Sequence, residues 1–306
     1  MTGRQDGARE LLARCTLPPP GTSVDCAFSG GADSTALVAL AMAAGCQVTA
    51  FHVDHGLRPE SSDEADQAKE LAGSLGADFR LVVADVAPGP NLEARARAAR
   101  YAALPHGVLT GHTADDRAET ILINVLRGSG LDGLAAMGPL PTRPLLALRR
   151  TETRRLCAEL GLAPVVDPSN TDPRFVRNRV RHELLPMMAD IAGRDVVPVL
   201  LRGVDVLGDD VSWLDEAAAG IDPTDARQLT VAPIALARRA VRRWLRGEGH
   251  PPDAATVQRV LAVAAGDHLA CEIAGGNRVE RHRQRLSVVP VRQVVSSDGM
   301  GSTGAC

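Results

Sequence analysis

The feature that most constrains the fold of this chain is the loop Ser29–Thr35, with the sequence Ser-Gly-Gly-Ala-Asp-Ser-Thr. It follows an alternating run at 24–28 that predicts a buried strand, and it precedes an apolar run at 36–42 that predicts a helix. Glycines let the backbone approach oxygen atoms closely, and the N–H groups of a helix N-terminus favour negative charge. The loop therefore predicts a site for phosphate or pyrophosphate, and hence use of a nucleotide.

The loop differs from two common nucleotide-binding motifs. It has no lysine, as a Walker loop would, and it lacks the Gly-x-Gly-x-x-Gly spacing of dinucleotide-binding folds. The alternative interpretation is a glycine-rich turn with no ligand.

Composition narrows the class of protein. The chain has 306 residues, enough for one large or two modest domains, and its net charge of −3 gives no global signature of nucleic-acid binding. Its six cysteines form no Cys-x-x-Cys pair, which argues against zinc and iron–sulfur sites. No signal peptide or membrane-spanning run is apparent, so we expect a cytoplasmic protein with free thiols and no membrane partner.

Strand and helix patterns alternate up to about residue 145, with further strands expected at 47–53, 79–83 and 107–110. Repeated βα units predict an α/β fold, a parallel sheet with helices on both faces. Ligands of such sheets bind at the carboxyl ends of the strands. The loop, the segment 52–55 and the segment 111–116 all fall at such ends, which predicts one shared site.

The pattern changes after about residue 190, so we expect a catalytic domain at 1–190 and a smaller, mainly helical domain at 191–306. A long helix at about 196–219 links the two, followed by helices near 234–246 and 254–265. Strand-like runs lie around 271–273 and 286–289. The Gly/Ser-rich tail from about 296 is expected to be disordered.

Acidic side chains cluster where the fourth strand ends. Asp115, Asp116 and Glu119 can share one side of a helix, with His112 just before them. Carboxylates beside a phosphate site suit Mg²⁺, although acids at a helix N-terminus also serve as plain caps. His52 and Asp54 share one face at the end of the second strand, where a polar strand end is the alternative.

Arginines concentrate between 143 and 181 and again between 238 and 246. Such clusters are either solvated helix faces or local footprints for RNA in a slightly acidic protein.

Several motifs accompany the loop in order: HVDHGLR at 52–58, NLEARAR at 91–97, GHTADDRAET at 111–120, LRGSGLDGL at 126–134, DPSN at 167–170 and RNRVRHELLP at 177–186. The loop resembles the PP-loop of the ATP pyrophosphatases, whose fold is Rossmann-like. The whole set, over about residues 22–190, resembles the tRNA(Ile)-lysidine synthetase family, and the short second domain implies a member with a reduced C-terminal part.

This resemblance implies an ATP-dependent ligase that forms a carbon–nitrogen bond during tRNA modification. ATP would adenylate the oxygen on carbon 2 of the wobble cytidine in the CAU anticodon of tRNA(Ile). The side-chain amine of free lysine would then attack that carbon, giving lysidine, AMP and pyrophosphate. The resemblance leaves open whether the protein is a homodimer.

The resemblance also implies roles for individual residues. The expected catalytic residues are Asp33, His112, Asp115, Asp116 and Glu119. The expected nucleotide-binding residues are Ser29, Gly30, Gly31, Ala32, Asp33, Ser34, His52 and Asp54, with Asp33 near Mg²⁺. One of the acids Asp54, Asp115, Asp116 and Glu119 would bind the lysine ammonium or take its proton, since the attacking amine must be neutral. The expected substrate-binding residues are Arg97, Arg127, Arg177, Arg179 and Arg181.

Three other functions fit parts of the pattern. A PP-loop tRNA thiolase would share the fold but would need catalytic or cluster-binding cysteines. An amidotransferase would need a glutaminase segment, and a non-catalytic nucleotide-binding module would not need the acid cluster.

Overall fold

The computed structural model describes residues 2–54, 61–84, 92–135, 138, 140–166, 168–246 and 252–291. The chain forms two compact units, Met1–Gly208 and Asp209–Cys306. The division falls inside one long helix, α10 (Val197–Ala219).

The first unit contains the parallel sheet predicted from the βα repeats. Its strands β1 (Ser23–Ala27), β2 (Gln47–Asp54) and β3 (Asp78–Val83) are hydrogen-bonded in that order. Both pairs are parallel, with Val24 opposite Val48 and His52 opposite Leu81. This parallel sheet with helical connections confirms the predicted α/β fold class.

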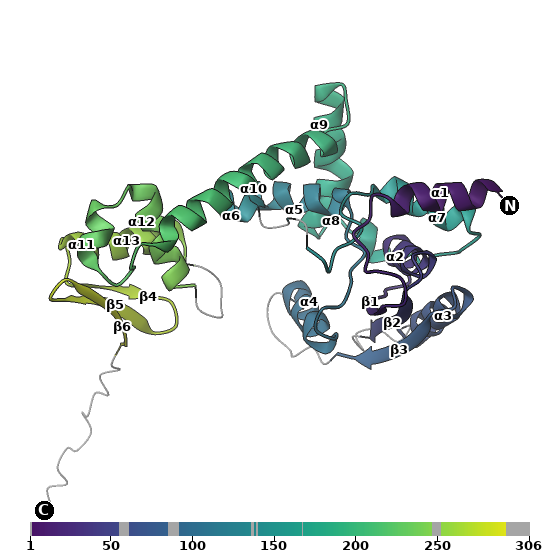
Figure 1. Cartoon of the computed structure of the whole chain (residues 1–306), viewed down its shortest axis with the longest axis horizontal. Helices are drawn as coiled ribbons and strands as arrows, with labels where there is room; N and C mark the ends of the chain where they lie inside the picture. Colours follow the sequence, from purple (N-terminus) through teal and green to yellow (C-terminus); the bar gives the residue numbers. More distant parts are fainter. Residues whose placement is uncertain are drawn as a thin grey trace, which may run out of the picture. The chain divides into compact units, whose positions relative to one another are not determined.

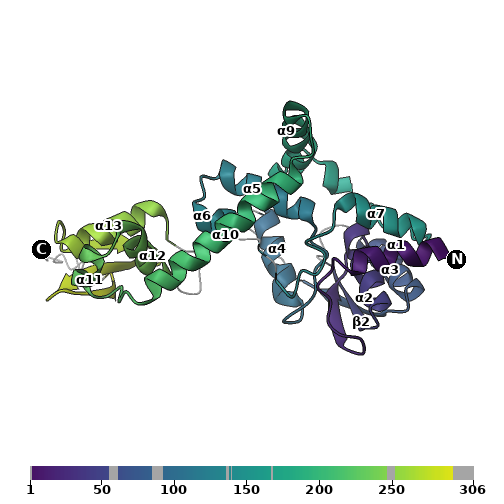
Figure 2. The same cartoon turned by 45° about the horizontal axis from the view of Figure 1, so that its top comes forward.

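Helices cover the sheet on both sides. Helix α2 (Ala32–Ala43) connects β1 to β2, and α3 (Ser61–Ser74) connects β2 to β3, so the chain moves in one direction across the sheet. Helix α4 (Leu92–Ala103) follows β3 and leads back toward the segment beside β1. Right-handed crossovers then place α2 and α3 on one face and α4 on the other. Figures 1 and 2 show α4 across the sheet from α2 and α3.

The fourth predicted strand, 107–110, is shorter than expected. Leu109 makes a single parallel bridge to Cys26, beside β1. The ladder stops there because the next residue, Thr110, donates its N–H to the carbonyl of Thr142 (2.8 Å), outside the sheet. The chain nevertheless runs alongside β1, so its carboxyl end still reaches the loop after that strand.

The core of this unit lies around α2, in which every residue from Ser34 to Ala41 is buried. Phe28, Leu37 and Leu40 are among its fully buried side chains. This explains why α2 has no clear polar face: strands and helices surround it, including α1 (Thr2–Leu12) and α7 (Arg150–Glu159).

The helical stretch from Val176 to Ala192 is divided into three parts. These are α8 (Val176–Arg179), a π-helix at Val180–Leu184 and α9 (Leu185–Ala192). Pro186 explains the break, because proline cannot donate the backbone hydrogen bond of a regular helix and its ring crowds the preceding turn. The remaining helices of this unit are α5 (Ala114–Leu126) and the short α6 (Leu131–Leu134), and a 3₁₀ turn spans Pro168–Thr171.

The second unit packs α11 (Ala226–Val231), α12 (Ile234–Trp244) and α13 (Ala254–Ala265) with a small sheet. The sheet is antiparallel, in the order β4 (Ala270–Ile273), β5 (Asn277–His282), β6 (Arg285–Pro290). Sequence patterns did not predict β5, because its sequence Asn-Arg-Val-Glu-Arg-His has one apolar side chain, the buried Val279. No helix in the described ranges is long and apolar enough to cross a membrane.

Candidate active site

The loop after β1 is built from glycines and hydroxyls. Gly30 has a positive φ of 78°, which favours glycine, and its carbonyl accepts the N–H of Val165 (2.9 Å). The Ser34 hydroxyl bonds the carbonyl of Gly31 (3.0 Å) and lies 3.2 Å from the Ser29 Oγ. These contacts hold the loop as a turn into α2, whose first N–H groups lack helical partners, as an anion site requires.

Gly111 brings the segment after the fourth strand directly against this loop. A Cβ on Gly111 would lie 2.7 Å from the carbonyl oxygen of Asp33 and 3.0 Å from the N of Ser34. Only glycine therefore allows this approach of two backbones. The contact confirms that the loop and the segment 111–116 meet.

Helix α5 places its acids at its N-terminus and along one side. Asp116 accepts the N–H and the hydroxyl of Thr113, both at 2.9 Å, and so caps the helix. Asp115 accepts the N–H of Arg150 (2.7 Å) and a two-point contact from the guanidinium of Arg149 at 3.0 and 3.1 Å. Capping of α5 therefore explains one oxygen of Asp116, but not the contacts that arginines make with both aspartates.

Glu119 is the centre of the arginine network. Its side chain is fully buried (0% exposed) and accepts four N–H groups: one from Arg150 (2.8 Å), one from Arg177 (2.9 Å) and two from Arg181 (2.7 and 3.0 Å). A carboxylate has about four lone-pair sites, so these donors fill them. Glu119 therefore orients three arginines and has no acceptor site left.

Arg150 connects this network to the loop. Besides Glu119, its guanidinium contacts Asp116 (2.7 Å) and Asp33 (3.2 Å), which lies in the first turn of α2. Thr153, one turn further along α7, donates its hydroxyl to the other oxygen of Asp33 (2.5 Å). The start of α7 thus fixes the carboxylate of Asp33 relative to those of α5.

The acids on α5 and on the loop respond differently to this environment. Burial favours a raised pKa for Asp115, Asp116 and Glu119, but arginines and backbone N–H groups outweigh it, and all three pKa values lie below the ordinary range. The pKa of Asp33 is raised, because burial outweighs the contacts from Thr153 and Arg150. Asp33 is therefore the acid of this group that holds a proton most readily.

The two histidines lie near the same edge of the sheet. His52 Nδ1 donates to the carbonyl of Phe28 (2.9 Å), the residue before the loop, and burial lowers the pKa of His52. A neutral ring with its proton on Nδ1 leaves Nε2 as an acceptor. His112 contacts the hydroxyl of Thr110 (2.8 Å), and Asp54 ends β2.

The predicted arginines are distributed unevenly. Arg177 and Arg181 lie inside the network, whereas Arg179 pairs with Glu183 (2.9 Å) on the surface. Arg127 is exposed at the C-terminal end of α5, about 16 Å along the helix from Asp116 at 1.5 Å per residue. The side chain of Arg97 lies outside the described residues.

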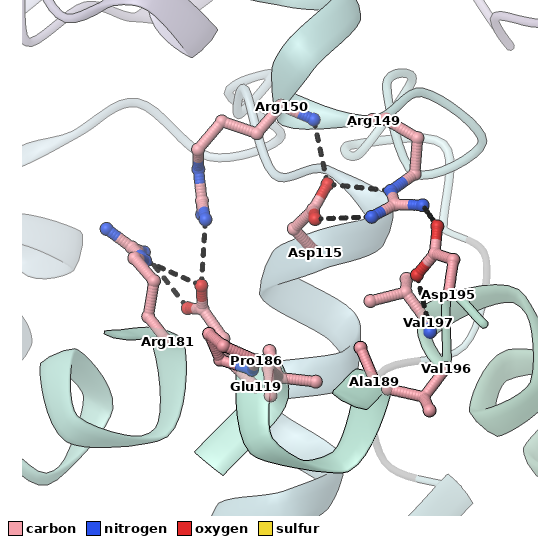
Figure 3. A pocket seen from close by; sticks show the side chains of 11 residues that line it. Asp115, Glu119, Arg149, Arg150, Arg181, Pro186, Ala189, Asp195, Val196 and Val197 are labelled. Atoms are coloured by element: carbon pink, nitrogen blue, oxygen red, sulfur yellow. Dashed lines mark hydrogen bonds and ion pairs between the residues drawn. The ribbon is translucent and has the colours of Figure 1, made fainter. Parts of the chain in front are cut away.

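A pocket of about 200 Å³ opens beside the network. Figure 3 shows Arg150, Glu119 and Arg181 on one side of it, and Asp115, Arg149 and Asp195 on the other. Asp195 contacts Arg149 and accepts the N–H of Val197 (3.0 Å) at the start of α10.

Sequence patterns did not reveal the roles of Arg149, Arg150, Thr153 and Asp195. One signal was available: two adjacent arginines stand at the start of α7. The helix dipole disfavours cations at that end, so their presence indicates nearby acids.

Comparison with known proteins agrees with this geometry. Residues 8–188 match the model of a PP-loop domain, and residues 225–287 match that of a TilS substrate-binding domain. The chain is 45% identical over 249 residues to the tRNA(Ile)-lysidine synthase of Nocardia farcinica, covering 76% of this chain and 78% of that protein. The chain belongs to the tRNA(Ile)-lysidine synthase family.

A second curated relative and one solved structure also resemble this chain. The tRNA(Ile)-lysidine synthase of Mycobacterium leprae is 43% identical over 242 residues, 73% of this chain and 75% of that protein. Among solved structures, the U34-tRNA thiolase NcsA from Methanococcus maripaludis aligns with a TM-score of 0.53 over 68% of this chain and 79% of its own. At 20% identity that likeness concerns the fold alone.

Proposed function

We propose that this site converts the wobble cytidine of the CAU anticodon of tRNA(Ile) to lysidine, using ATP and free lysine. The observation that carries the proposal is the arginine network joining Asp33 of the loop to Asp116 and Glu119 of α5. A non-catalytic nucleotide-binding module would have no use for carboxylates held in this way.

In the proposed reaction the loop binds the pyrophosphate part of ATP. Charge builds up on the pyrophosphate as it leaves, and preorganised N–H donors at the start of α2 stabilise it without reorganising. His52 and Asp54, at the neighbouring strand end, and His112 then position the nucleotide or the cytidine.

The lysine amine must lose a proton before it attacks. Glu119 has its acceptor sites filled by arginines, so this task falls to another acid. Asp115 and Asp116 each have one oxygen with a single N–H donor within hydrogen-bond distance, from Arg149 (3.0 Å) and Arg150 (2.7 Å). We assign the binding or deprotonation of the amine to these two residues.

The residues also fit a magnesium ion at Asp33. Within the described ranges no three His, Cys, Asp or Glu side chains gather in a way that could hold a metal. A nucleotide site does not require such a group, because Mg²⁺ takes one or two carboxylates and completes its shell with phosphate oxygens and water. Asp33, one-quarter exposed, would hold the ion, which would neutralise phosphate charge.

We assign the tRNA to both domains, with residues 1–190 as the catalytic domain and 191–306 as the linker helix and tRNA-binding domain. The match of 225–287 to a substrate-binding domain supports this assignment. The proposed tail from about 296 lies outside the described residues, and a homodimer stays a prediction.

A thiolase is the second candidate for this fold, and the cysteines argue against it. Cys26, Cys46 and Cys157 are buried, and burial raises the pKa of Cys26 to about 12 and that of Cys157 to about 11. Such thiols are poor nucleophiles.

The decisive experiment incubates the purified protein with Mg-ATP, labelled lysine and an unmodified tRNA(Ile) transcript bearing CAU. We expect label on that tRNA and none on a transcript with uridine at the wobble position. Release of AMP without lysine transfer would point to another nucleophile, and no AMP release would leave a nucleotide-binding module.

Two substitutions test the site itself. Asp33→Asn and Asp116→Asn should each lower lysidine formation by at least 100-fold, because they remove charges that Arg150 connects. The matched control is Asp66→Asn, on the exposed side of α3, which should leave the rate unchanged. Full activity of both site variants would contradict the assignment.

A further inference from the structure

The arginines between residues 143 and 181 differ in whether an acid holds them. Seven of the nine form an ion pair with a carboxylate: Arg149, Arg150, Arg155, Arg174, Arg177, Arg179 and Arg181. Of the other two, Arg154 is exposed, so water can solvate it. Arg143 is only partly exposed, and its Nη1 is buried with no acceptor within reach in the described part of the chain. Buried donors almost always have a partner, so Arg143 is the arginine of this cluster that lacks one.

The backbone of Arg143 lies beside the segment that leads into α5. The carbonyl of Thr142 accepts the N–H of Thr110 (2.8 Å), and the carbonyl of Leu148 accepts the N–H of Ala114 (2.8 Å). These two hydrogen bonds show that the two segments run side by side in the same direction. Arg143, the residue after Thr142, therefore stands at the carboxyl edge of the sheet, where ligands of such folds bind.

This segment lies on the side of the fourth strand that faces away from β1. Leu109 uses both its N–H and its carbonyl for hydrogen bonds with β1, each of 2.8 Å. Successive residues of a strand direct these groups to opposite sides, so Thr110 bonds on the other side. Neighbouring strands lie about 4.8 Å apart, which places Arg143 two spacings, about 10 Å, from β1. In the proposed function the loop after β1 holds pyrophosphate, so Arg143 meets a different part of the substrates.

Arg143 is held in place by its own segment. Its backbone N–H donates to the carbonyl of Leu140 (2.9 Å), and Leu145, two residues further on, is fully buried in the main core. Pro144 follows directly, and the residue before a proline is restricted to extended conformations. A guanidinium on such a fixed backbone is preorganised, so it loses less freedom when it binds an anion.

We propose that Arg143 binds a phosphate of the RNA backbone next to the wobble cytidine. The inference rests on the proposed function and adds a substrate-binding residue outside the acid network. A base that leaves its stack to enter a site brings its two flanking phosphates to the edge of that site. A planar guanidinium can donate two parallel N–H groups to the oxygens of one phosphate. The RNA thus supplies the acceptor that the protein does not.

The first test measures binding of tRNA(Ile) to the full-length protein at several salt concentrations. Arg143→Gln should weaken binding about tenfold and lower the slope of log affinity against log salt by about 0.7, the value for one phosphate of a single strand. The KM for ATP and the KM for lysine should each stay within about twofold, because the contact is made to neither. Arg143→Lys keeps the charge, so it should keep the slope and lose only part of the affinity.

The matched control is Arg154→Gln, which removes the other arginine of the cluster that has no acid partner. Arg154 is exposed on α7, so neither the tRNA affinity nor the salt slope should change. Urea unfolding of each variant shows whether it is folded.

A second readout neutralises the phosphate instead of the arginine. Two tRNA(Ile) molecules each carry one uncharged methylphosphonate, on the 5′ or the 3′ side of the wobble nucleotide. One of them should bind the unaltered protein about tenfold more weakly than normal tRNA, and Arg143→Gln should show no such loss, because its contact is already absent. If Arg143→Gln does not fold, Arg143→Lys takes its place and should lose less affinity than the unaltered protein.

Three results would overturn the assignment and leave lysidine synthesis standing. They are no loss with either methylphosphonate, equal losses for the unaltered protein and the variant, and a raised KM for ATP with unchanged tRNA binding. If the unaltered protein forms no lysidine on unmodified tRNA(Ile), the proposed function itself fails.

Discussion

Two arginine-rich segments look alike in the sequence but are used differently in the fold. Around α5 the side chains of Arg150, Arg177 and Arg181 are 13%, 26% and 20% exposed, and all three contact one buried glutamate. On α12, by contrast, the acid that is contacted is exposed: Arg239 pairs with Asp215, which is 58% exposed, and Arg238 is itself exposed and contacts Gln258 at 3.4 Å. The difference shows that an arginine joins a buried network only where the fold also buries the acid that it contacts.

The strongest test of this contrast is Arg150→Met. It removes the cation shared by Asp33, Asp116 and Glu119, which leaves buried carboxylates facing each other. Breaking a buried ion pair by removing one partner costs about 3–5 kcal/mol. We expect a loss of this size in the free energy of unfolding, measured by urea denaturation, together with loss of lysidine formation.

The control for that variant is Arg154→Met, one turn along α7 with an exposed side chain. It should change the free energy of unfolding by less than about 0.5 kcal/mol. Equal losses in the free energy of unfolding would show that Arg150 contributes no more to stability than an exposed arginine does.

Asp115→Asn tests the same network, and we expect it to lower the free energy of unfolding less than Arg150→Met does. The folded-state pKa of Asp115 is lowered, chiefly by Arg149 against the effect of burial, so its stabilisation is full above the unfolded pKa of about 3.9. It is lost as the pH falls through the folded value. We expect the variant to be about 1–3 kcal/mol less stable at pH 7 and the difference to shrink below pH 4.

Thermal or urea unfolding at pH 7, 5, 4 and 3 measures this difference. If the difference in the free energy of unfolding between the unaltered protein and Asp115→Asn stayed constant down to pH 3, the charge of Asp115 would not contribute to stability.

Substitution of arginines on the second unit should change tRNA binding and leave stability alone. The double variant Arg238→Gln, Arg246→Gln removes two exposed charges at α12 and its C-terminal end. For every phosphate that the variant no longer neutralises, the slope of log affinity against log salt should fall by about 0.9. Filter binding of tRNA across salt concentrations measures the slope, and an unchanged slope would remove α12 from the RNA-binding surface.

The smallest effect is expected at an exposed ion pair of the second unit. Thr224 and Arg285 lower the pKa of Asp222 to about 2, but this carboxylate is 39% exposed, and solvent screens the pair. Asp222→Asn should therefore cost less than about 1 kcal/mol at pH 7, with the difference vanishing as the pH approaches 2. A loss as large as that of Arg150→Met would contradict the distinction between buried and exposed pairs.

Local patterns predicted much of the fold. The βα repeats predicted the parallel sheet, and the helix expected at 254–265 coincides with α13. The errors arose where distant contacts decide the structure. Thr110 leaves the sheet for Thr142, and β5 depends on pairing with two neighbours rather than on its own polar sequence.

The candidate site was likewise predicted where local motifs carry the signal and missed where distant contacts decide. Asp33, Asp116 and Glu119 could be singled out because each stands in a short motif beside a strand end or helix start. Arg150 could not, because its contacts lie 31 to 117 residues away in the sequence. The sequence also predicted Arg177 and Arg181 as RNA contacts, without the information that Glu119 would hold both of them.

The contact between Gly111 and the carbonyl of Asp33 joins two loops without any intervening side chain. A side chain between two segments can absorb a shift by changing its rotamer, but two touching backbones cannot. A displacement of the first turn of α2 toward Gly111 would therefore push directly on the backbone segment that leads into α5.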